Sequence, residues 1–185
     1  METILQELLA AMQQDEPIPF DAIPSIDLYM DQVTTYLDSL LSSNLRSQED
    51  KVFTKTMINN YTKDGLLPSP VKKKYTRCHL MLLIMIFKLK QTLSISDIGQ
   101  LLSPVIQNPD LLPSFYEQFC QIEQMQKQEF LSRTQQEFTE VQNLLAESQA
   151  TEALRLYAMA LAAQAASQKR LAEKILDQLQ AESQK

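Results

Sequence analysis

Glycine is almost missing from this sequence, because only Gly65 and Gly99 occur among 185 residues. Tight hairpin turns that need a positive φ angle would therefore lack the residue that adopts it most easily. Glycine-rich phosphate loops and dinucleotide-binding fingerprints are excluded as well, since both need several glycines where the backbone approaches a phosphate. This scarcity of glycine, in a chain rich in Leu, Gln, Ala and Ser, predicts an all-α protein.

Cysteine and long apolar runs are also scarce. Cys78 and Cys120 stand alone, without the CxxC spacing of a zinc site or a redox pair. The longest apolar run, residues 80–87, is far shorter than the ~20 residues that cross a bilayer. Because no Lys or Arg precedes Arg46, the charged start of a signal peptide is missing too. We therefore expect a cytoplasmic protein with no membrane partner.

The net charge of −6 hides a strong segregation of charge along the chain. Residues 1–43 hold eight acidic residues and no Lys or Arg, residues 44–92 hold ten Lys and Arg against three acidic residues, and residues 93–185 hold seven against twelve. A local basic block can steer a polyanion even when the whole chain is acidic. A solvated basic face without a partner is the alternative interpretation.

Apolar spacing predicts several short helices in the first hundred residues. We expect them over residues 2–14, 27–42, 55–64, from Thr76 through 89, and over about 95–102. The apolar run in the helix after Thr76 predicts an element buried by several others.

Helix ends carry their own signals. The Thr54 hydroxyl is expected to cap the helix over 55–64 and Gly65 to end it, while Ser94 and Asp97 form a capping pattern. Proline predicts the irregular segments, namely an extended linker after residue 14 and a loop that starts at Pro104.

The region from Ser114 onward has neither Gly nor Pro and carries a helical apolar stripe. A break near Ser148 would make two long helices that fold back as a hairpin, whereas without it a coiled-coil-like rod of roughly 100 Å must find a partner chain. Either form leaves apolar surface uncovered in a monomer, so we expect a homodimer. The residues expected at its interface are Phe115, Phe119, Ile122, Phe138, Val141, Leu145, Leu154, Leu161, Leu171, Ile175 and Leu179.

Three ordered segments resemble the MerR family of bacterial transcription regulators. Residues 54–68, TKTMINNYTKDGLLP, resemble the second helix of that family and the turn after it. Lys73, Lys74 and Tyr75 match a basic residue near a tyrosine after the family's wing, and residues 94–102, SISDIGQLL, match a later helix. Residues 23–33, IPSIDLYMDQV, with 54–61 and 72–75, are also similar to the bacterial family catalogued as domain of unknown function 1836, whose members are regarded as MerR-like.

This resemblance covers roughly residues 20–105 and implies a helix-turn-helix fold. The expected organisation is an N-terminal amphipathic helix and Pro-rich linker over 1–22, a MerR-like helix-turn-helix domain over 23–105, and a long-helix dimerisation region over 106–185. A long dimerising helix after the DNA-binding unit is also what the MerR resemblance implies. The function to expect is therefore regulation of transcription by a homodimer on double-stranded DNA.

The first helix is longer than in MerR proteins, the loop over 43–53 lacks their glycine turn, and the wing is reduced to a few residues. Thr56 and Asn59 stand where MerR recognition helices usually carry arginines. Asn can still pair with adenine through two hydrogen bonds, and Lys can neutralise phosphate. The residues expected to contact DNA are Lys55, Thr56, Asn59, Asn60, Lys63, Lys72, Lys73, Lys74 and Arg77.

Other functions have less support in the sequence. His79 is the only histidine, and it points about 100° away from its neighbour Cys78 on a helix, so we expect a structural pair and no metal site. We expect no catalytic residues, no cofactor and no enzymatic activity. A protein-assembly module that reuses the helix-turn-helix fold is the alternative function. A weaker alternative makes the helical tail a sensor of a small-molecule effector, which the sequence does not identify.

Overall fold

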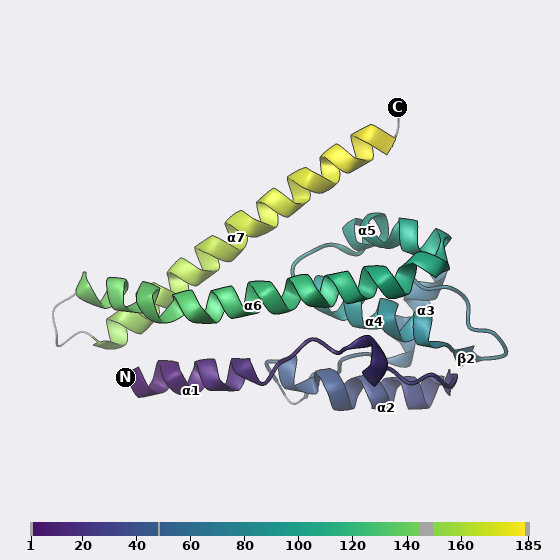
Figure 1. Ribbon diagram of the computed structural model, residues 1–185, viewed down its shortest axis with the longest axis horizontal. Coiled ribbons are helices and arrows are strands. Elements are labelled where there is room, and N and C mark those ends of the chain that lie inside the picture. Colours follow the sequence, from purple (N-terminus) through teal and green to yellow (C-terminus); the bar gives the residue numbers. More distant parts are fainter. Residues whose placement is uncertain (1, 48, 145–149, 184–185) are drawn as a thin grey trace. The chain divides into compact units, whose positions relative to one another are not determined.

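The computed structural model describes residues 2–47, 49–144 and 150–183 (Figure 1). Within these ranges the chain forms seven α-helices, three short 3-10 helices and one two-stranded sheet. The all-α class with long C-terminal helices is therefore confirmed. None of the helices in these ranges is long and apolar enough to cross a membrane.

The chain divides into two compact units. The first holds Ile18–Cys120 together with Leu179–Lys185, and the second holds Met1–Pro17 and Gln121–Gln178. The first unit extends beyond the expected 23–105 domain at both ends, because Ile18, Leu112 and Tyr116 belong to its apolar core. The Tyr116 hydroxyl donates a hydrogen bond of 2.7 Å to the Ile18 carbonyl, which ties these two ends together.

Helix α4 (Arg77–Leu89) is the centre of the first unit. Every residue from Leu80 to Phe87 is buried, as the apolar run predicts. Apolar faces of α2 (Met30–Leu41), α3 (Lys55–Lys63) and α5 (Ile95–Gln107) contribute to the same core. Burying an apolar side chain stabilises a fold by about 1.5–3 kcal/mol, so this helix dominates the stability of the unit.

A two-stranded antiparallel sheet joins the segment before α2 to the segment before α4. Strand β1 (Leu28–Tyr29) pairs with β2 (Lys74–Tyr75), so that Leu28 lies opposite Tyr75. Apolar and proline spacing in the sequence does not predict this sheet. Two-residue strands are too short to show an alternating pattern, so their pairing depends on tertiary contacts.

The prediction of a loop from Pro104 is wrong, because α5 continues to Gln107 with Pro104 inside it. A proline inside a helix removes one backbone hydrogen bond. Here Pro104 is exposed, Val105 beyond it is buried, and the Asn108 amide still donates to the Pro104 carbonyl at 3.1 Å. Burial of the last turn therefore outweighs the missing bond. Helix α6 (Leu112–Asn143) likewise begins two residues earlier than expected, with Pro113 in its first turn, where proline is tolerated.

The second unit packs α1 (Glu2–Gln13) against the C-terminal part of α6 and the first half of α7 (Ala150–Ser183). Its core is formed by Leu5, Phe138, Ala153 and Tyr157. The Phe138 and Tyr157 rings meet edge to face, with centroids 5.5 Å apart. In one continuous helix Phe138 and Tyr157 would lie roughly 28 Å apart. Because their rings are in contact, the two long helices fold back on each other. The predicted break near Ser148 lies outside the described residues.

Candidate nucleic-acid interface

Helix α3 has both of the ends that the sequence predicts. The Met57 amide donates to the Thr54 hydroxyl at 3.1 Å, which caps the N-terminus. At the C-terminus Gly65 has a φ of 76°, a left-handed conformation that glycine adopts without steric cost. The chain turns there, and the Leu66 amide donates to the Tyr61 carbonyl at 2.9 Å. These bonds fix the orientation of a helix only nine residues long.

The apolar face of α3 is buried and its polar face is open. Ile58 is fully buried, and Tyr61 packs edge to face on Phe53 with ring centroids 6.1 Å apart. Met57 packs against the same core, and Thr62 is half-buried. The exposed residues are Lys55, Thr56, Asn59, Asn60 and Lys63, which are the α3 residues predicted to contact DNA.

The three consecutive lysines form a tight turn beside the small sheet. Lys72 and Lys73 have φ angles of 51° and 64°, and the Lys74 amide donates to the Val71 carbonyl at 3.0 Å. Positive φ at both central residues is the pattern of a type I′ turn, which usually contains Asn and Gly. Lys72 and Lys73 are exposed, whereas Lys74 is half-buried with Nζ 5.3 Å from the centre of the Tyr29 ring.

Arg77 is turned towards the protein, unlike the other predicted contact residues. Its guanidinium lies 4.5 Å from the centre of the Phe20 ring, and Nε donates to the Pro24 carbonyl at 3.4 Å. Arg77 is half-buried and braces the segment before α2 against α4. Lys55 keeps its exposed position but forms an ion pair with Asp31.

Lys90 is a second member of the basic block that packs against the core. Its ammonium donates to the Val52 carbonyl at 3.0 Å and lies over the Phe53 and Phe87 rings. Burial lowers the pKa of Lys90 from its usual value. Lys90 and Arg77 therefore contribute less to the exposed positive surface than the sequence count indicates.

A cleft of about 450 Å³ lies beside the N-terminus of α3. Five of its lining residues are exposed. Thr35, Lys51, Thr54 and Lys55 could bind a phosphate oxygen, whereas the Asp38 carboxylate would repel one. Thr35 and Lys51 are absent from the predicted site. Lys51 counts towards the basic block, but Thr35 gives no signal in the sequence, because its place beside α3 depends on how α2 packs.

His79 is a structural residue of α4. It is 5% exposed, and its Nδ1 accepts a hydrogen bond of 3.0 Å from the Thr76 amide at the start of the helix. Burial lowers the pKa of His79, although the Pro68 and Ser69 carbonyls and the Asp27 charge act in the opposite direction. Within the described ranges, no group of three or more His, Cys, Asp and Glu side chains is placed to hold a metal ion.

The residues predicted for a dimer interface divide into three groups. Phe138, Val141, Leu154 and Leu161 pack in the core of the second unit, and Phe119 packs against that of the first. Phe138 is fully buried within its own chain, so it is not open to a second copy. Leu145 lies outside the described residues. The exposed members are Phe115, Ile122, Leu171, Ile175 and Leu179.

The fold and this surface together define a small helical domain with an exposed, lysine-rich short helix and turn. Residues 18–119 match the family model described as Domain of unknown function (DUF1836), and the chain belongs to that family. The match has almost the same limits as the first compact unit, Ile18–Cys120. No curated protein and no solved structure matched the chain.

Proposed function

We propose that this protein is a cytoplasmic, non-enzymatic regulator of transcription that binds double-stranded DNA as a homodimer. In this proposal α2 and α3 form a MerR-like helix-turn-helix, and α3 is the recognition helix. The observation that carries the proposal is the exposed polar face of α3, which presents two amides between two lysines while its apolar face is buried.

The side chains on α3 have the chemistry that base reading requires. An Asn amide can accept a hydrogen bond from the exocyclic amine of adenine and donate one to its N7, whereas Lys neutralises phosphates. Asn59 and Asn60 are exposed and lie between Lys55 and Lys63, so one helix offers both kinds of contact. Asn is a poor helix former, so two exposed amides in so short a helix add little stability.

The resemblance to MerR regulators agrees with how the turn after α3 is built. The segment Gly65 to Pro68 turns the chain, and both leucines within it are buried in the core. The lysine turn then follows before α4, where a winged protein would carry its wing.

Selection of bound sequences from a random duplex pool tests the proposal. The parent protein is expected to enrich a motif, and Asn59→Ala/Asn60→Ala is expected to lose it, at a cost of about 1–3 kcal/mol for each adenine contact. Nonspecific binding should be unchanged, because the amides carry no charge. Asn143→Ala, an exposed amide at the end of α6, is the matched control. A parent protein that enriches no motif at physiological salt would contradict the proposal.

An assembly module that does not bind DNA is the second candidate. The ion pair of Lys55 with Asp31 and the inward positions of Arg77 and Lys90 favour it, because they reduce the free positive charge. No detectable binding to duplex DNA even at low salt would support this candidate, because phosphate contacts bind most tightly under that condition.

A further inference from the structure

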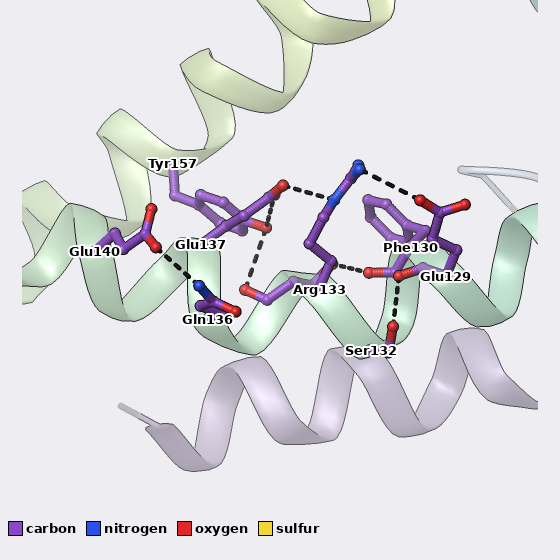
Figure 2. A network of polar contacts seen from close by, with 9 residues as sticks. Glu129, Phe130, Ser132, Arg133, Gln136, Glu137, Glu140 and Tyr157 are labelled. Atoms are coloured by element: carbon purple, nitrogen blue, oxygen red, sulfur yellow. Dashed lines mark hydrogen bonds and ion pairs between the residues drawn. The ribbon is translucent and has the colours of Figure 1, made fainter.

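A cleft of about 460 Å³ opens between the end of α6 and the first half of α7. Val141, Leu144 and Leu161 give it an apolar lining, and Glu137 and Glu140 add two carboxylates. All of these residues belong to the second compact unit. Figure 2 shows the two carboxylates on α6, with Tyr157 reaching towards Glu137 from α7.

Hydrogen bonds hold both carboxylates in place. The Arg133 guanidinium contacts Glu137 at 2.8 Å, and the Tyr157 hydroxyl donates to the same carboxylate at 3.3 Å (Figure 2). Glu140 accepts a hydrogen bond of 3.1 Å from the Gln136 amide. Arg133 offsets the charge of Glu137, so Glu140 supplies most of the negative charge beside the apolar floor. The cleft therefore suits an apolar group that carries positive charge beside it.

The next turns of α7 carry an exposed apolar side chain with basic residues beside it. Leu171 is 61% exposed, and it lines a shallow hollow of about 220 Å³ with Ser167, Arg170 and Lys174. Arg170 and Lys174 are exposed as well. An apolar side chain between two cations is the complement of the cleft.

Both features lie on one face of α7. Residues Tyr157, Leu161, Gln164, Gln168, Leu171 and Ile175 are spaced alternately by four and three residues, which is the spacing of a helix seam. The α6 helix covers the beginning of this seam, where Tyr157 is buried and Leu161 half-buried. The later part is open, since Ile175 is 53% exposed.

We propose that a second copy of this chain covers the open part of the seam, with the two α7 helices antiparallel about a two-fold axis near residue 166. This arrangement rests on the homodimer of the proposed function and states how it forms. It places Leu161 opposite Leu171 of the second copy, and Gln164 opposite Gln168.

In this dimer the cleft of each copy contacts the basic hollow of the other copy. Leu171 of each copy enters the cleft of the other, and Arg170 and Lys174 meet Glu137 and Glu140. Because a two-fold interface uses the same patch on both copies, each contact occurs twice. Leu161 and Leu171 are about 15 Å apart along α7, so both exchanges fit on one pair of helices.

A charge-swap series on the full chain tests this interface, with the dimer Kd measured by sedimentation velocity over a range of concentrations. Glu140→Lys and Lys174→Glu should each weaken the dimer about tenfold, because each places like charges opposite one another twice. The double variant Glu140→Lys/Lys174→Glu should restore most of the loss. Lys169→Glu makes the same charge change off the seam, where Lys169 pairs with Glu173 at 3.6 Å, and is expected to leave the Kd unchanged. Circular dichroism checks that every variant is folded.

Leu171→Ala supplies an uncharged test and should also weaken the dimer. A dimer whose Kd does not respond to the single reversals, or a double variant that dimerises no better than either single one, overturns this interface and leaves the homodimer in place. A parent chain that stays monomeric at tens of micromolar overturns both the interface and the homodimer. DNA binding is measured separately, so a chain that dimerises without binding DNA would contradict only the proposed regulation of transcription.

Discussion

Replacing Lys72 by Asn and Lys73 by Gly should make the protein more stable and weaken its binding to DNA. Both lysines have positive φ angles, 51° and 64°, in the turn that is closed by the hydrogen bond from Lys74 to Val71. A left-handed conformation costs an ordinary residue about 1–2 kcal/mol, because Cβ crowds the following carbonyl oxygen. Asn followed by Gly is the sequence that this type of turn favours most.

The expected gain in stability is about 1–2 kcal/mol. Relief of strain at two residues contributes about 2–4 kcal/mol. Glycine reduces this gain by about 0.5–1 kcal/mol, because it increases the entropy of the unfolded chain. Asn reduces it further, because it keeps part of the strain that Lys had. For a protein of this size, each kcal/mol raises Tm by about 2–4 °C.

The same variant loses two exposed charges from the proposed DNA surface. If each lysine neutralises one phosphate, the slope of log affinity against log salt should become shallower by about 1.8. Lys72→Ala/Lys73→Ala is the matched control, because it removes the same charges but keeps a Cβ at both positions. Urea unfolding followed by circular dichroism measures stability, and a salt titration with duplex DNA measures the slope.

Two results would refute this reasoning separately. If the Asn-Gly variant is no more stable than the Ala-Ala variant, the left-handed lysines are not strained. If both variants bind DNA with the slope of the parent protein, the lysine turn lies outside the DNA interface.

Three further predictions concern the fold. His79→Gln should flatten the fall in stability between about pH 7 and 5. The folded pKa of His79 lies below its ordinary value of 6.5, so unfolding takes up a proton there and stability is lost as the pH falls below 6.5. Gln can still accept the hydrogen bond from the Thr76 amide, as Gln32 accepts from the Tyr29 amide at 2.9 Å. Urea unfolding at several pH values measures the difference in stability between the variant and the parent protein. Phe138→Ala should cost the second unit about 3–5 kcal/mol, with faster hydrogen exchange in α1 and α7, while Leu144→Ala, whose side chain is 81% exposed, should change little. Thr54→Ala should cost about 0.5–2 kcal/mol in thermal unfolding, whereas Thr56→Ala on the same helix removes no cap and is the control.

Structural features that depend on residues within one or two helical turns could be predicted from the sequence. The Thr54 cap and the left-handed Gly65 are present as predicted, and Ser94 and Asp97 form the expected capping box. Each depends on residues no more than a few positions apart, so composition and spacing determine them. The burial of α4 was predictable for a similar reason, because a helix that is apolar on all sides cannot be stable in contact with water.

Contacts between segments that are far apart in the chain could not be predicted from the sequence. The inward turn of Arg77 requires Phe20 and Pro24, which are more than fifty residues earlier in the chain. Burial of Phe138 requires α7 to fold back over α6, and the sequence alone left a continuous rod open as an alternative. The exposure of the polar face of α3 agrees with the sequence pattern, but the free positive charge around it is lower than the sequence count indicates.

The lysine turn is where the chain departs most clearly from its own local rules. At the ends of α3 and α5 the residue types suit the backbone, with glycine at the left-handed end of α3 and capping residues at the start of both helices. At Lys72 and Lys73, two long cationic side chains occupy positions that favour Asn and Gly, and a third lysine follows. Local conflicts of this kind concentrate at functional sites. An assembly module would need the fold but not adjacent cations on a strained turn, whereas a phosphate backbone rewards that arrangement, which favours DNA as the partner of this surface.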